Sequence, residues 1–176
     1  LSRGLGDVYK RQMLDSVVFT PTNNQARPGA SVATTITATV SNAGMTTPEP
    51  NTVVTVTAVN DPAAVAGLAP VVSGDGVAAV SPFAGVTVTD DDLGASDSVT
   101  VTLLGANGRP TDANGVLAGL VETGLGSGVY TVTGTPGQVT AALRAARFLP
   151  AAGASSTTTL ALSIASDGAA AEPDTV

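Results

Sequence analysis

Four aspartates lie within eight residues in the middle of the chain: Asp90, Asp91, Asp92 and Asp97. No lysine or arginine lies between them, so their negative charges repel one another at short range. Such a group is stable either in open solvent or around a bound cation. Carboxylate oxygens favour a hard ion, and Ca²⁺ is the candidate that suits them best. The spacing is not that of an EF-hand loop, so a solvated acidic turn and a calcium site are both open interpretations.

The chain has few of the groups that catalysis requires. It contains no histidine and no cysteine, and its single lysine is Lys10. A serine nucleophile would therefore lack its usual base, and a thiolate metal site is excluded. Paired aspartates serve as acid and base in glycosidases, but here they lie in a turn without a predicted cleft. We expect that the protein is not an enzyme.

Charge and hydropathy limit the partners of the chain. Its seven basic and 14 acidic residues give a net charge of −7 at pH 7. Such a surface repels nucleic acids and anionic membranes, so no nucleic-acid partner is expected. No run of about 18 apolar residues occurs, which predicts no membrane insertion.

Patterns typical of β-strands occupy most of the chain. On the two sides of the acidic turn, Val86 and Val88 share one face, as do Val99, Val101 and Leu103, while threonines alternate with them. Further strands are predicted within residues 16–20, 35–40, 52–60, 65–72, 77–80, 83–88, 98–104, 116–121 and 129–133. The sequence therefore predicts an all-β fold.

One helix is predicted over residues 138–145. Thr135 is suited to the N-cap, Pro136 to the first helical position, and Gln138 stands three residues after the cap. Val139 and Leu143 then follow at helical spacing. The helix is too short to persist alone, so we expect it to cover a sheet.

The chain contains an internal repeat. Residues 14–21 align with residues 143–150 at an offset of 129, with leucine, phenylalanine and proline recurring in the same order. Residues 29–31 match residues 153–155 at an offset of 124. The first copy therefore has five more residues than the second, and they fall in the asparagine-rich loop before Gly29. Residues 49–53 match residues 172–176 at an offset of 123. Matches at separate landmarks indicate a tandem repeat.

The repeat predicts three segments. Residues 1–12 differ in composition from the rest, and residues 4–12 resemble translated sequencing-adapter read-through, so we treat them as a non-native stretch; a genuine short linker is the alternative. Residues 13–61 are expected to be the C-terminal strands of a truncated repeat. Residues 62–176 are expected to form a second repeat that lacks its last strand.

Several motifs together resemble one family. They are Val-Asn-Asp-Pro at 59–62, Ser-Pro-Phe at 81–83 before the acidic turn, Tyr-Thr-Val-Thr-Gly-Thr-Pro at 130–136, and the leucine, phenylalanine and proline of 143–150. They resemble the cadherin-like, immunoglobulin-like repeats of giant bacterial surface and secreted proteins, often found in calcium-binding adhesins. The resemblance implies antiparallel β-sandwich repeats with one short helix, located outside the cell or at the bacterial surface.

The resemblance also implies ligands for Ca²⁺. In such repeats, acidic residues at the link and at strand-end turns bind the ion and stiffen the junction. The implied positions are Asn60, Asp61, Asp90, Asp92 and Asp167, to which the acidic turn adds Asp91 and Asp97. For Asn60 and Asp61, an ordinary turn before Pro62 is the alternative.

Two functions follow as expectations. The first is a structural or adhesive module whose partners are the neighbouring repeats of the same chain, stiffened by Ca²⁺. The alternative is a binding module whose loops, such as residues 105–128, contact a protein or glycan on a host or neighbouring cell. The scarcity of aromatic residues, 3% of the chain, disfavours a glycan.

Overall fold

Alternation of valine with threonine forms the central strand of the molecule, β7 (Asp97–Leu104). Val99, Val101 and Leu103 are completely buried, whereas Thr100 and Thr102 on the opposite face are partly exposed. The period of two that the sequence predicted is therefore confirmed. β7 pairs with β10 on one side and β12 on the other, within a five-stranded antiparallel sheet of order β13-β12-β7-β10-β9.

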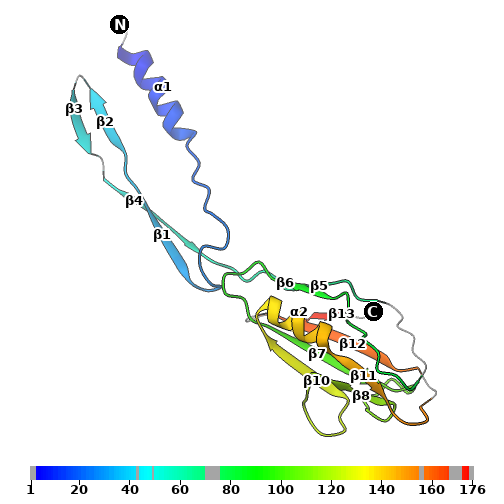
Figure 1. Cartoon of the computed structure of the whole chain (residues 1–176). Helices are drawn as coiled ribbons and strands as arrows, with labels where there is room; N and C mark the ends of the chain where they lie inside the picture. Colours follow the sequence, from blue (N-terminus) through cyan, green and yellow to red (C-terminus); the bar gives the residue numbers. More distant parts are fainter. Residues whose placement is uncertain are drawn as a thin grey trace.

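The computed structural model describes residues 3–42, 44–48, 50–69, 76–154, 157–166 and 172–174. Its fold is all-β, with antiparallel sheets and two short helices among these residues (Figure 1). The other elements are α1 (Arg3–Asp15), β1 (Ser31–Ile36), β2 (Thr39–Asn42), β3 (Met45–Pro48), β4 (Thr52–Thr57), β5 (Ala64–Ala66), β6 (Thr87–Thr89), β8 (Gly115–Ala118), β9 (Val121–Glu122), β10 (Val129–Gly134), α2 (Pro136–Ala145), β11 (Arg147–Pro150), β12 (Thr159–Ala165) and β13 (Glu172–Asp174).

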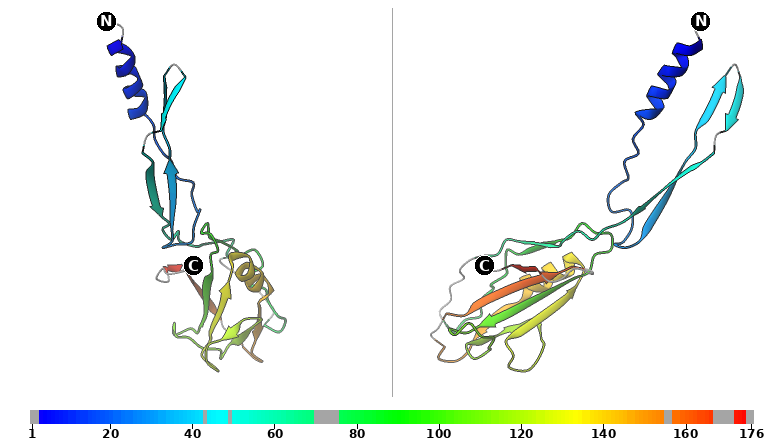
Figure 2. Two further views of the ribbon diagram at one scale, coloured as in Figure 1. Left: turned by 90° about the vertical axis from the view of Figure 1, so that its left-hand side faces the viewer. Right: turned by 180° about the vertical axis from the view of Figure 1, so that it is seen from behind.

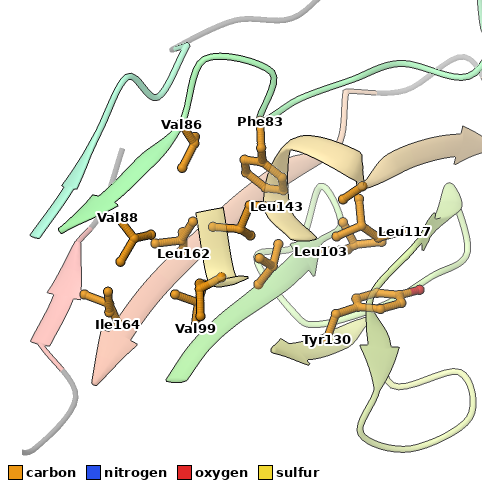
Figure 3. Close-up of a cluster of buried hydrophobic side chains, with 13 residues drawn as sticks. Phe83, Val86, Val88, Val99, Leu103, Leu117, Tyr130, Leu143, Leu162 and Ile164 are labelled. Atoms are coloured by element: carbon orange, nitrogen blue, oxygen red, sulfur yellow. The ribbon is translucent and has the colours of Figure 1, made fainter. Parts of the chain in front are cut away.

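A hydrophobic core lies between the five-stranded sheet and a covering layer that includes α2 and β6. Side chains from β6, β7, β12 and α2 meet there (Figure 3). Val86, Val139 and Leu143 are completely buried, and burying such a side chain contributes about 1.5–3 kcal/mol. We call this part of the chain, from residue 62 onward, the β unit.

Helix α2 is fixed at both ends. Thr135 and Gln138 form the predicted capping box, in which each side chain accepts a hydrogen bond from the other residue's backbone N–H. At the other end, Nη1 of Arg147 donates to the carbonyl oxygens of Arg144, Ala145 and Ala146. The helix prediction is confirmed, and Arg147 serves the orphan carbonyls of the last turn.

Residues 31–57 form a two-stranded ribbon that projects away from the β unit (Figures 1 and 2). β1 pairs with β4, and β2 pairs with β3, both antiparallel. Ile36 and Val40 are 39% and 54% exposed on this ribbon. The sequence predicted one strand over residues 35–40, with side chains that alternate between its two faces. In the structure this strand is interrupted at residues 37–38.

Several predicted strands are shorter than expected or absent. Residues 16–20 form no strand, because Ser16 lies in the turn that ends α1 and no partner strand lies beside residues 17–20 among the described residues. Of the run predicted at 65–72, residues 65–66 belong to β5, residues 67–69 lie outside any strand, and residues 70–72 are outside the described part of the chain. The run at 77–80 gives one bridge between Val80 and Phe148. A strand needs a hydrogen-bonded neighbour as well as a pattern.

Helix α1 was not expected from the sequence, which indicated one short helix in all. It spans most of the stretch regarded as non-native and continues to Asp15, and its described side chains, from Val8 onward, are exposed. It therefore contributes nothing to the core through those side chains.

Candidate metal site at the junction

The link between ribbon and β unit is tied to the acidic turn by a backbone hydrogen bond. The N–H of Asp61 donates to Oδ2 of Asp92 over 2.9 Å. Asp92 itself is only 8% exposed, so this carboxylate lies under the link and not in open solvent. Two segments 31 residues apart in the sequence are thus in direct contact.

The end of β12 joins the same junction. Nδ2 of Asn60 donates to Oγ of Ser166 over 3.1 Å and to the carbonyl oxygen of Asp61 over 3.0 Å. The hydroxyl of Ser166 lies 3.5 Å from the same carbonyl, to which it donates. Ser166 is buried, 7% exposed, so the link is fixed to the end of the sheet as well as to the turn.

The acidic turn folds back on itself. The N–H of Asp92 donates to Oδ1 of Asp90 over 2.8 Å, as in an Asx turn, and the N–H of Ala95 donates to the carbonyl oxygen of Asp92 over 3.2 Å. Asp91 is exposed and stands apart from these contacts. The turn therefore directs Asp90 and Asp92, but not Asp91, toward the junction.

Asp97 lies at the same end of the sheet as Ser166. It is the first residue of β7 and is completely buried, 0% exposed. Because Ser98 pairs with Ala165, Asp97 and Ser166 come next on neighbouring strands. Asp167 lies outside the described residues, so its predicted role stays a prediction.

Two oxygen atoms of the junction are suited to a cation. Oδ1 of Asn60 and Oδ2 of Asp90 are buried, and neither has a hydrogen-bond partner among the described residues. A buried oxygen that lacks a donor costs about 1–3 kcal/mol, and a cation would remove that cost. The available donor set is carboxylate, amide and carbonyl oxygen, which is the set that Ca²⁺ prefers.

The side chains do not form a preassembled cluster. In the part of the chain that the structure describes, no three carboxylate, imidazole or thiolate side chains converge as a metal group would require. A cation at this place would therefore depend on amide and backbone oxygens as well as on Asp90 and Asp92. The oxygen ligands present suit a calcium ion by their chemistry.

The structure brings together more than the sequence reasoning named. Asn60, Asp61, Asp90, Asp92 and Asp97 are gathered at one end of the β unit. Ser166 was not among the predicted residues. It immediately precedes Asp167, so the same strand-end signal could have identified it.

The region proposed for loop-based binding is also ordered by backbone contacts. The N–H of Leu103 donates to the carbonyl of Gly128, and the N–H of Thr111 donates to the carbonyl of Leu103. A shallow depression is lined by Asn107, Arg109 and Thr111 together with small residues, without an aromatic side chain.

The comparisons with known proteins leave the family open. The chain matches no family model, and it has no significant match among curated proteins or solved structures. No helix among the described residues is both long and apolar enough to cross a membrane.

Proposed function

We propose that the β unit is an immunoglobulin-like or cadherin-like β-sandwich repeat of a large extracellular bacterial protein. Its work is mechanical, since it holds neighbouring repeats of the same chain in an extended array. The all-β fold, the internal repeat and the acidic composition support this proposal. Negative surface charge favours solubility and keeps repeated units apart.

The observation that carries the proposal is the meeting of three segments at the junction. The link at Asn60 and Asp61, the acidic turn at Asp92 and the strand end at Ser166 are joined by hydrogen bonds. Bending at the link must break these contacts, so the junction resists bending.

Ca²⁺ is the proposed cofactor of this junction. Asn60, Asp61, Asp90, Asp92 and Asp97 are the described residues that would hold it, with Asp167 as a further predicted ligand. When bound, the ion supplies positive charge that offsets the repulsion between carboxylates of the turn and the link. The link would then be ordered relative to the β unit, which is what a stiff stalk requires.

A calcium-dependent melt of the full chain tests this proposal. An ion at 100 times its dissociation constant adds about 2.7 kcal/mol to the free energy of unfolding, which raises the Tm of a chain of this size by several degrees. We expect that rise in millimolar Ca²⁺ relative to EDTA, and we expect the double variant Asp90→Asn/Asp92→Asn to lose it.

Asp91→Asn is the matched control, because it removes a charge from the same turn but from an exposed side chain. It should retain most of the calcium-induced rise in Tm. An equal Tm in Ca²⁺ and EDTA for the unmodified chain would contradict the calcium part of the proposal. Equal losses in the Asp91 variant and in the double variant would assign the effect to general charge and not to this site.

The alternative function is binding through the loops of residues 105–128. The depression around Asn107, Arg109 and Thr111 favours a polar ligand such as a protein surface over a glycan. Binding of the full chain to an array of glycans and surface proteins, lost in Arg109→Ala, would support this alternative.

A further inference from the structure

A single arginine from the ribbon side of the molecule lies on the acidic turn. Gly94, two residues after Asp92, has a φ of +73°. A Cβ added to Gly94 would lie 3.0 Å from Cζ, from Nε and from Nη2 of Arg27. Three equal distances mean that the guanidinium plane faces the Gly94 Cα, a close approach that a glycine permits without displacing the arginine.

Arg27 is held in this position by a turn. The N–H of Ala30 donates to the carbonyl of Arg27 over 3.0 Å, with Pro28 and Gly29 between them and a φ of +80° at Gly29. This is the arrangement of a type II β-turn. The chain around Arg27 is therefore preorganised.

The turn is also fastened to the link. The N–H of Gly29 donates to the carbonyl of Ala58, and the N–H of Ala58 donates to the carbonyl of Ala30, both over 2.9 Å. Ala58 precedes Asn60 by two residues. The arginine and the link thus reach the acidic turn as one unit.

The segment that carries Arg27 is an insertion relative to the second copy of the repeat. Between Pro21 and Gly29 the first copy has five more residues than the second has between Pro150 and Gly153. The hairpin of the second copy forms without them. The extra residues are therefore not required for the hairpin, and their contact with Gly94 gives them another role.

Arg27 also differs from the other arginines of the β-rich part. Arg144 donates to the carbonyl of Val86, and Arg147 donates to the end of α2. Arg109 lies in the loop region of residues 105–128, which we call the distal loop. Among the arginines of the described residues after residue 12, Arg27 is the one at the acidic turn.

We propose that the Gly94 surface of the acidic turn is the docking surface for the preceding unit, and that Arg27 is the cationic side chain that docks there. Arg27 provides a resident positive charge against Gly94, two residues after Asp92 in the acidic turn. The junction is thereby held in one orientation even without a metal ion. The inference concerns the junction of the proposed function but does not depend on Ca²⁺ binding.

The test measures the orientation of the ribbon relative to the β unit in EDTA. The chain has no cysteine, so paired spin labels can be attached to the full chain at Thr35→Cys and Ala141→Cys, two exposed positions. Electron–electron double resonance then reports the distribution of distances. We expect Arg27→Gln to broaden it and to lower the ratio of docked to undocked molecules about two- to fivefold, the range for an exposed charge contact.

Two matched variants control for charge and for backbone strain. Arg109→Gln removes the same charge from the distal loop and should leave the distribution unchanged. Gly94→Ala should broaden it, whereas Gly108→Ala should not, because Gly108 has a similar φ of +70° but open space around its Cβ position.

Equal distributions for Arg27→Gln and Arg109→Gln would overturn the proposal, as would equal distributions for Gly94→Ala and Gly108→Ala. The same samples in Ca²⁺ separate the two proposals. Narrowing by Ca²⁺ with equal distributions for Arg27→Gln and Arg109→Gln in EDTA would support the metal site alone, and a broader distribution in Arg27→Gln without any response to Ca²⁺ would support the arginine contact alone.

Discussion

Tyr130 combines burial with a hydroxyl group that has no hydrogen-bond partner among the described residues. It is 3% exposed on β10, opposite Val101 and Glu122. Burial raises the pKa of Tyr130 above its usual 10.0, and the nearby Leu117 backbone, which acts in the opposite direction, does not cancel that rise. The hydroxyl therefore stays protonated in the folded chain at pH values where an exposed tyrosine loses its proton.

Replacing Tyr130 by phenylalanine should leave stability unchanged or raise it by up to about 1 kcal/mol, because the substitution removes a buried hydroxyl whose approach to the Leu117 backbone falls short of hydrogen-bond geometry. The unmodified chain should also lose stability above about pH 10, since there the unfolded state releases a proton that the folded state retains. Urea unfolding between pH 8 and 11 measures both effects.

In Tyr130→Phe the fall in the free energy of unfolding above pH 10 should be smaller than in the unmodified chain. Tyr9→Phe is the control, because Tyr9 is exposed on α1 and should leave the alkaline decline as it is. An identical decline in all three chains would show that Tyr130 does not cause it.

At the scale of elements, α2 does more than cover the core. Oγ1 of Thr140 accepts a hydrogen bond of 2.9 Å from the N–H of Val88, and Nε of Arg144 donates over 2.7 Å to the carbonyl of Val86. β6 pairs with β5 along its other edge. Side chains of the helix therefore take the place of a further strand beside β6, which satisfies backbone groups that a short edge strand would leave unpaired.

Thr140→Val tests this role of the helix. The two side chains have similar shapes, but valine cannot accept the hydrogen bond of the Val88 N–H, so the free energy of unfolding should fall by about 1–3 kcal/mol. The midpoint of urea unfolding measures the change. Thr55→Val, at an exposed position of β4, should shift that midpoint little, and equal shifts in the two variants would contradict the role assigned to Thr140.

At the scale of the whole molecule, aligned segments of the two repeats form antiparallel hairpins in different surroundings. In the β unit, β12 lies between β13 and β7, and its Leu162 and Ile164 are buried. On the ribbon, the aligned Val40 is 54% exposed. The difference in exposure follows from the neighbouring strands. β12 has β7 beside it, whereas in the described part of the chain the ribbon has no strand in the corresponding position.

A hybrid chain tests the repeat directly. It joins residues 62–150 to residues 22–61, so that the ribbon hairpin replaces the C-terminal hairpin. Residues 49–51 would then take the place of the aligned β13, and the six residues of β4 would continue the edge strand beyond them, paired with residues 31–36. These further cross-strand pairs should add about 0.2–1 kcal/mol each to the free energy of unfolding, measured by urea unfolding against the full chain.

Deletion of Thr37 from the hybrid is the control, because a shift of one residue turns the side chains that follow it to the opposite face. This variant should lose the gain. A hybrid that fails to fold, or one indifferent to the deletion, would contradict the alignment of the two copies.

The sequence by itself determined the features that depend on neighbours along the chain. The alternation in β7 and the capping box of α2 are visible in the sequence because strand periodicity and helix capping act over a few residues. The candidate site was predicted in part for the same reason, since clustered aspartates at Asp90–Asp92 stand out without any structure.

Only the tertiary structure decided which of these features meet. Asn60 and Ser166 are 106 residues apart, and their hydrogen bond exists because the link returns to the end of the sheet. The contact of Arg27 with Gly94 likewise depends on a turn fastened to Ala58. Residues 16–20 carry a strand pattern but have no partner strand in the described part of the chain. Contacts between distant segments are set by packing and hydrogen bonding across the fold, which local sequence patterns do not encode.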